Sequence, residues 1–170
     1  AAAPTVTDSK GNTWTLDRTG VDAGNTVRTC VFSANVTNPL VGGAPITVST
    51  SVATLRRAAV VDQFSGVLIS ASRVDRVNGR TGTSTAPSVN VTTVNPDDLL
   101  IGAVAVAGPS TESFTQDGSG WNDLGARGTT GAGTASQDRT IRGGWRSVGT
   151  VGAYAYAPTL GVSTVWVAAF

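Results

Sequence analysis

The sequence predicts an all-β fold, a single antiparallel β-sandwich with a jelly-roll-like arrangement. Three observations predict it. Apolar and polar residues alternate with period two along most of the 170 residues, which is typical of half-buried strands. No window carries the i, i+3, i+4 apolar stripe of a helix. About nine or ten such runs are separated by turn sequences, as in sandwiches and barrels.

The first half of the chain supplies five expected strands, which lie at residues 12–16, 26–32, 45–50, 55–64 and 88–94. Each is rich in β-branched or aromatic residues, which fit a pleated surface. Trp14 and Leu16 share one face of the first of these strands, and core packing is expected for Trp14 and for Trp166.

The run 98–107 is apolar on both faces, and the turn residues 95–98 precede it. This combination favours a central strand that is covered on both sides. Further strands are expected at 140–148 and 161–170. Two long polar stretches, 65–86 and 109–137, are expected to form loops, which often carry recognition in such folds.

Composition excludes several classes of function. The chain has no His, one Cys and one Glu, Glu112, so His-based catalysis and multi-thiolate metal sites are ruled out. The net charge of +1 gives no field for a polyanion, and no segment approaches the ~20 apolar residues of a membrane span. We therefore expect no enzyme activity, no cofactor, no nucleic-acid partner and no membrane insertion.

Several acidic residues and the cysteine were weighed as sites. Asp97 and Asp98 are adjacent and are expected to form the turn before a strand, and a hydrolase that acts through Asp residues is the weakest hypothesis. Cys30 is expected to be a buried, inert thiol. Calcium stays an open alternative to simple turns in the early Asp-rich segments, which contain Asp8, Asn12, Asp17 and Asp22.

The aromatic residues suggest a ligand-binding surface. Trp121 follows the polar turn 117–120 and is the best candidate for an exposed stacking platform, with capping of the core as the alternative. Tyr154 and Tyr156 alternate with alanines and therefore share one face, which is either a core stripe or a binding stripe.

Arginine supplies nearly all the positive charge, because Lys10 is the only lysine. Arginines suit contacts with carboxylates at protein interfaces. The sequence predicts partner contacts at two of the arginine groups, with pairing to the scattered aspartates as part of their role. The predicted partner contacts are Arg73, Arg76, Arg80, Arg139 and Arg142.

Two motifs carry a resemblance. Residues 59–67 read AVVDQFSGV and residues 97–108 read DDLLIGAVAVAG. In this order the chain resembles the concanavalin-like jelly-roll modules of phage virion proteins and bacterial surface proteins, although Gln63 stands where that pattern is usually acidic. The resemblance implies a non-catalytic module.

The expected function is that of a virion structural protein, a capsid decoration or tail-associated module at the virion surface, which contacts other virion proteins or copies of itself. The alternative is an extracellular carbohydrate-binding or adhesion module of a bacterial surface protein that binds a cell-surface glycan. The chain, residues 1–170, is expected to be one domain. Because it lacks Met even at position 1, we expect a processed chain, a fragment or a trimmed start.

Overall fold

The computed structural model describes residues 2–51, 56–70, 72–108, 113–128 and 138–170, which form strands and no helix. The predicted all-β, antiparallel β-sandwich is confirmed. The strands in chain order are β1 (Thr5–Asp8), β2 (Trp14–Val21), β3 (Arg28–Ala34), β4 (Ile46–Ser49), β5 (Gly79–Ser84), β6 (Val89–Thr92), β7 (Asp98–Ala107), β8 (Phe114–Thr115), β9 (Asn122–Gly128), β10 (Arg139–Val148), β11 (Ala153–Tyr156), β12 (Thr159–Leu160) and β13 (Thr164–Ala169).

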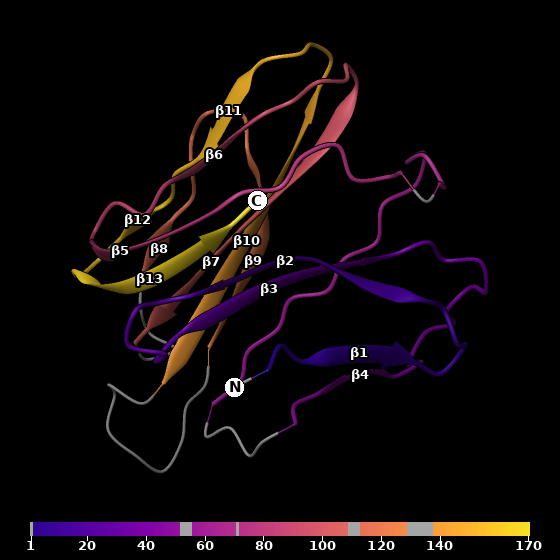
Figure 1. Ribbon diagram of the computed structural model, residues 1–170, viewed down its shortest axis with the longest axis horizontal. Helices are drawn as coiled ribbons and strands as arrows, with labels where there is room; N and C mark the ends of the chain where they lie inside the picture. The colour runs from indigo at the N-terminus through magenta and orange to yellow at the C-terminus, as the bar shows by residue number, and fades with distance from the viewer. Residues whose placement is uncertain (1, 52–55, 71, 109–112, 129–137) are drawn as a thin grey trace.

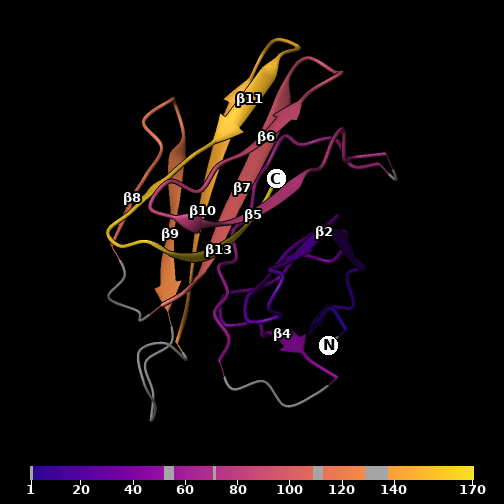
Figure 2. The ribbon, with the colours of Figure 1, turned by 60° about the vertical axis from the view of Figure 1, so that its left-hand side comes forward.

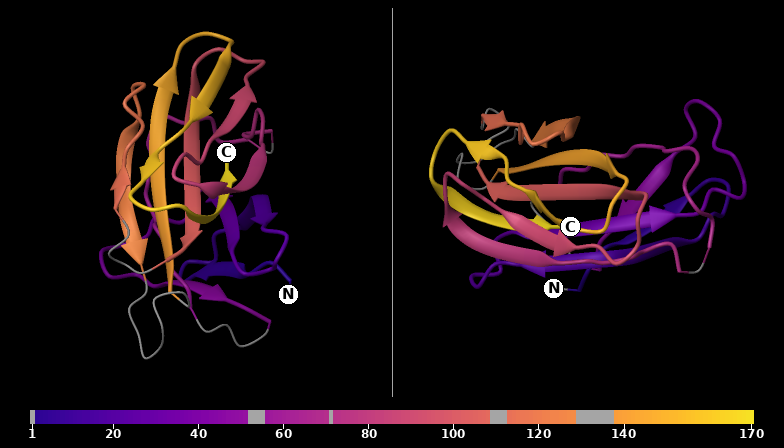
Figure 3. Two further views of the ribbon diagram at one scale, coloured as in Figure 1. Left: turned by 90° about the vertical axis from the view of Figure 1, so that its left-hand side faces the viewer. Right: turned by 90° about the horizontal axis from the view of Figure 1, so that it is seen from above.

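A five-stranded antiparallel sheet in the order β5-β13-β7-β10-β9 forms the centre of the fold (Figure 1). β7 is paired along its whole length with β10, from Asp98 opposite Val148 to Ala107 opposite Arg139. Four two-stranded pairs, β1-β4, β2-β3, β6-β11 and β8-β12, complete the structure. Figures 2 and 3 show β2, β3 and β4 on one side of the long central strands, apart from β6 and β11.

The first face of the five-stranded sheet carries the larger core. Leu100, Val104 and Val106 of β7 pack there with Trp166 of β13 and with fully buried Tyr156 of β11. The second face carries a smaller cluster around Ala105 and Val167, against which Val27 packs. The expectation that β7 is covered on both sides is confirmed, because its alternate side chains point into different clusters.

Two glycines allow β11 to approach the first face closely. Gly102 of β7 lies opposite Gly144 of β10 in the ladder. A Cβ atom on Gly102 would lie 2.4 Å from Cγ of Tyr156, and one on Gly144 would lie 2.8 Å from Cε2 of the same ring. The tyrosine ring therefore rests on a flat patch of backbone that any larger residue would occupy.

Several sequence-based strand and loop assignments need correction. Residues 56–64 run without a ladder partner, so the predicted strand at 55–64 is wrong for the residues described, and Leu55 lies outside them. The stretch 65–86 contains β5, an edge strand whose sequence GRTGTS has no apolar residue to reveal it. The stretch 109–137 contains β8 and β9, while residues 109–112 and 129–137 lie outside the description.

The first predicted strand is also only half right. Trp14 is half-buried and its indole N–H donates to Asp8 at 2.8 Å, but Leu16 is 37% exposed. The register between β2 and β3 shifts between Leu16 and Arg18, which changes the facing of the side chains there. Trp166, at 5% exposure, lies in the core as predicted.

Candidate interaction groove

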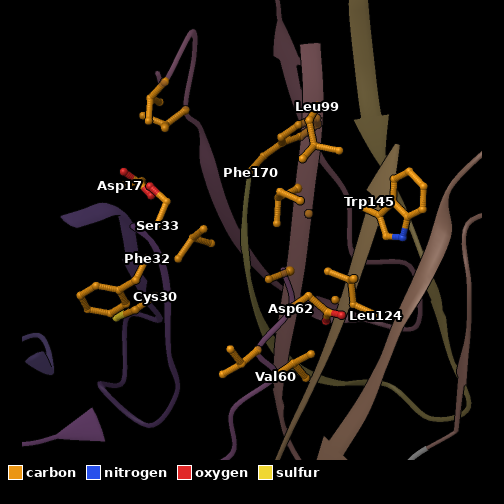
Figure 4. A pocket seen from close by; sticks show the side chains of 18 of the residues that line it. Asp17, Cys30, Phe32, Ser33, Val60, Asp62, Leu99, Leu124, Trp145 and Phe170 are labelled. Carbon is orange, nitrogen blue, oxygen red and sulfur yellow. The ribbon is translucent and has the colours of Figure 1, made fainter. Parts of the chain in front are cut away.

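An open groove of about 2390 Å³ lies over the second face of the five-stranded sheet. β3 borders it on one side, and β9 and β10 border it on the other. Figure 4 shows Cys30, Phe32 and Ser33 of β3 across from Leu124 and Trp145, with Val60 and Asp62 between them. A small-molecule pocket usually measures roughly 300–1,000 Å³, so this groove is larger than a typical small-molecule site.

Residues 56–70 and 72–77, which we call the groove segment, run along this space. Its first part is fastened at two points: Nε of Arg56 lies 3.1 Å from Oδ1 of Asp138, and the ring of Phe64 meets that of Trp145 edge-on at 5.7 Å between centroids. These contacts tie the segment to residues at and beside β10.

The second part of the groove segment is fastened by polar contacts. Nε of Arg73 donates to Oγ of Ser33 at 2.9 Å, and its guanidinium lies 3.6 Å from the carboxylate of Asp17. Oδ2 of Asp75 accepts the backbone N–H of Val94 at 2.7 Å. The ends of the groove segment are thus held by β2, β3 and the turn after β6.

Between these anchors the backbone of the groove segment lies outside every ladder that the described residues form. Among the described residues, no hydrogen bond joins the backbone of residues 58–69 to another part of the chain. Burial alternates over 56–61, where even-numbered residues are half-buried and odd-numbered ones are exposed. This is the pattern of a single strand lying flat on a sheet, with both of its hydrogen-bonding edges open.

The groove segment also exposes an unusual share of large aliphatic side chains. Leu68 is 70% exposed, Ile69 67% and Val61 54%. Half of the strongly exposed large hydrophobic residues among those described fall between 61 and 77, namely Val61, Val67, Leu68, Ile69, Val74 and Val77. A concentration of apolar surface of this kind is typical of an interaction site.

A small group of carboxyls lies at the end of the groove segment. Burial, followed by the nearby charge of Asp75, raises the pKa of Asp98, and its Oδ2 is buried without a hydrogen-bond partner. The backbone N–H of Val94 lowers the pKa of Asp75. Asp97 sits beside them with φ of 59°, as part of the predicted turn before β7. The arrangement holds the groove segment to the β6–β7 turn.

The predicted aromatic platform is not available on the surface. Trp121 is 7% exposed, its ring meets those of Tyr156 and Phe170, and its indole N–H donates to the carbonyl of Ala155 at 2.8 Å. The expectation of an exposed Trp121 is therefore wrong, and the residue caps the core instead. Tyr156 is fully buried, and burial raises the pKa of its hydroxyl.

Tyr154 is the one member of that set that is only partly buried, and it packs against the same core. It is half-buried, the guanidinium of Arg146 lies 5.3 Å from its ring centroid, and its hydroxyl donates to the carbonyl of Thr150 at 2.6 Å. Because Tyr156 points into the core, the two tyrosines do not form a joint binding stripe. Ligand binding at Tyr154 stays a prediction.

The predicted contact arginines fall into three situations. Arg73 and Arg142 form internal ion pairs, with Asp17 and Asp123 respectively, so pairing with aspartates is confirmed for these two. Arg139 donates to the carbonyls of Thr26 and Asp138. Arg76 and Arg80 are exposed and well placed for contacts with another molecule. The structure does not gather the five arginines on one patch.

The early aspartates act as turn-forming groups. Oδ1 of Asp8 accepts the backbone N–H of Lys10 at 2.8 Å, and Asp22 accepts the N–H groups of Gly24, Thr26 and Val27. These contacts support the turn interpretation over calcium binding. No cluster of three metal-ligating side chains of the His, Cys, Asp and Glu types occurs within the described parts of the chain. Cys30 is half-buried rather than fully buried as expected, and this burial raises the pKa of its thiol, in keeping with an inert cysteine.

Sequence reasoning missed the role of the groove segment, although the signal was present. The run 55–64 was read as an ordinary strand of the sandwich because its residues alternate and are β-branched. The same pattern also fits a strand that has no neighbour within its own chain. The difference lies in pairing, and pairing depends on distant parts of the chain.

None of the described residues lies in an apolar helix of membrane-spanning length. Comparison of the chain with models of protein families, with curated proteins and with solved structures finds no match.

Proposed function

We propose that this chain is a non-catalytic structural module of a virion that acts through contacts with other proteins. The observation that carries the proposal is the groove segment, which combines an open backbone with a run of exposed aliphatic side chains. Unpaired strands and exposed apolar surface are the two features by which β proteins bind extended partners.

The other features of the chain support a binding role rather than chemistry. The chain has no His and a single Glu, so general acid–base chemistry would depend mainly on aspartates. The described aspartates largely accept backbone N–H groups or pair with arginines. The resemblance of residues 59–67 and 97–108 to jelly-roll modules of phage virion proteins supports the virion as the setting.

The test is to locate the protein in particles. An antibody raised against the chain should label virions from the source culture at regularly repeated positions in electron microscopy. A variant in which both Leu68 and Ile69 are changed to Ser should fail to appear on particles, whereas Val162→Ser, also strongly exposed but outside the groove segment, should appear normally. Particles that carry no copy of the protein would refute the proposal.

The carbohydrate-binding alternative has weaker support. Its proposed platform depends on Trp121, Tyr154 and Tyr156, and two of these are buried. Binding of a glycan that is lost in Tyr154→Ala would favour it over the virion role.

A further inference from the structure

We propose that the groove segment binds a second copy of this chain by antiparallel pairing of residues 56–62 with the same residues of the other copy, with Ala59 at the two-fold axis. The inference rests on the proposed function, since it names a partner for the same surface. Three observations carry it: the open backbone, the placement of the segment on its sheet and the charges along it.

The open backbone is the first observation. Residues 58–69 make no backbone hydrogen bonds among the described residues. A strand of this kind presents rows of N–H and C=O groups that are best satisfied by another strand. Pairing between two copies supplies that strand without any change in the fold of either.

The placement of the segment restricts the possible registers. Even-numbered residues from 56 to 60 are half-buried toward the sheet. In a two-fold antiparallel pair, residues directly opposite each other point to the same face. The two numbers in each pair must therefore add to an even total. Both copies then keep their even-numbered side chains against their own sheets.

The charges select one register from this set. Arg56, Arg57 and Asp62 are the charged residues between 56 and 64. Arg57 opposite Asp62 gives an odd total and is excluded by the symmetry. Arg56 opposite Asp62 gives an even total, and the two-fold axis makes this pair twice. The same register places Ala58 opposite Val60 and Ala59 opposite Ala59, so that small residues face larger or equally small ones.

Competing registers are less favourable. Centring the pair on Val60 brings Ala58 opposite Asp62 and leaves the arginines without a facing carboxylate. Centring it on Asp62 or on Arg57 brings like charges into direct opposition, which destabilises a strand pair. Arg56 also contacts Asp138, and its guanidinium has five N–H donors with which to serve both carboxylates.

Disulfide trapping tests the register directly. In a Cys30→Ser background, Ala59→Cys places two thiols across the axis, with Cα atoms roughly 4.5–5.5 Å apart, which suits a disulfide. Val61→Cys is the matched control, because Val61 is also exposed in the segment but would lie about 14 Å from its counterpart. Mild oxidation should link the Ala59→Cys chains much faster than the Val61→Cys chains.

Charge reversal tests the pairing by a second route that leaves Arg56 in place. The unmodified chain should show concentration-dependent dimerisation in sedimentation, and Asp62→Arg should weaken it by at least about tenfold, because two attractive pairs become repulsive. A mixture of Asp62→Arg with a folded Arg56→Asp chain should recover dimers, since each variant supplies the charge that the other lacks. Asp62→Arg alone remains decisive if Arg56→Asp does not fold.

Equal linking of the two cysteine variants, or a chain that stays monomeric at every concentration, would overturn the self-pairing. Labelled particles together with a monomeric chain would leave the proposed function standing and assign the groove segment to a different protein. Dimers that form in solution without any copy on particles would support the self-pairing and refute the proposed virion role.

Discussion

The two faces of the five-stranded sheet are built in different ways. The first face is closed by aromatic rings, with the ring of Trp121 in contact with those of Tyr156 and Phe170. The second face is covered by β2 and β3 at one end and by the unpaired groove segment over the rest. The contrast indicates that the first face supplies most of the stability and that the second is available for binding.

The largest expected effect is a loss of stability when a large side chain is removed from the first face, which we call the closed face. Tyr156→Ala removes a fully buried ring and its hydroxyl contact with Gln116. Loss of a buried aromatic side chain costs about 3–5 kcal/mol in free energy of unfolding, measured by urea denaturation. Tyr154→Ala, on the same strand but half-buried, should cost clearly less. Equal losses would contradict the assignment of the closed face as the main core.

Overfilling the same face should have the next largest effect. Gly102→Ala introduces a methyl group 2.4 Å from Cγ of Tyr156, and overpacking of this kind costs about 1–3 kcal/mol or more. Gly118→Ala is the control, because a Cβ there meets nothing within 4 Å. Thermal unfolding should separate the two variants, and an unchanged Gly102→Ala protein would show that Tyr156 can move aside.

A smaller, pH-dependent effect is expected where the two regions meet. The pKa of Asp98 is raised by burial and by Asp75, so the folded state binds its proton more tightly than the unfolded state does. The contribution of Asp98 to stability is therefore lost as pH rises from the unfolded pKa through the folded one. Asp98→Asn should gain stability relative to the unmodified chain over that range. A difference that does not change with pH would contradict this.

The smallest effect on stability is expected for substitutions in the groove segment, on the second face of the sheet. Changing both Leu68 and Ile69 to Ser alters side chains that are mostly in water, so the free energy of unfolding should change by less than about 0.5 kcal/mol. The same variant should not be found on virions by antibody labelling, as described under the proposed function. A large loss of stability would mean that these side chains belong to the core of the isolated chain.

The sequence predicted most of the closed face because its signals are local. β7 was predicted with its observed bounds, since residues 98–107 are apolar on both faces and follow an Asn-Pro turn. Trp166 was placed in the core for a similar reason. β5 was missed because a polar edge strand is defined by its partner β13 and carries no apolar pattern of its own.

The candidate site was much harder to predict. Trp121 follows a polar turn, and its burial depends on Tyr156 and Phe170, which come from distant parts of the chain. The groove segment has the composition of an ordinary strand, and no ladder among the described residues includes it. Local sequence shows that residues 56–64 can form a strand, but it carries no information about which strand they pair with.

The twelve peptide groups from Ala58 to Ile69 also make the chain its own reporter of assembly. Amide hydrogens without an internal acceptor exchange with solvent rapidly, while those within the β7–β10 ladder exchange only when that ladder opens. Deuterium uptake along 58–62 should thus be fast in the isolated chain and slower, once a second copy is paired, at the amides that face it, while uptake along 63–69 stays fast. Isotope labelling can therefore read occupancy of this segment in intact particles, without a tag or a substitution.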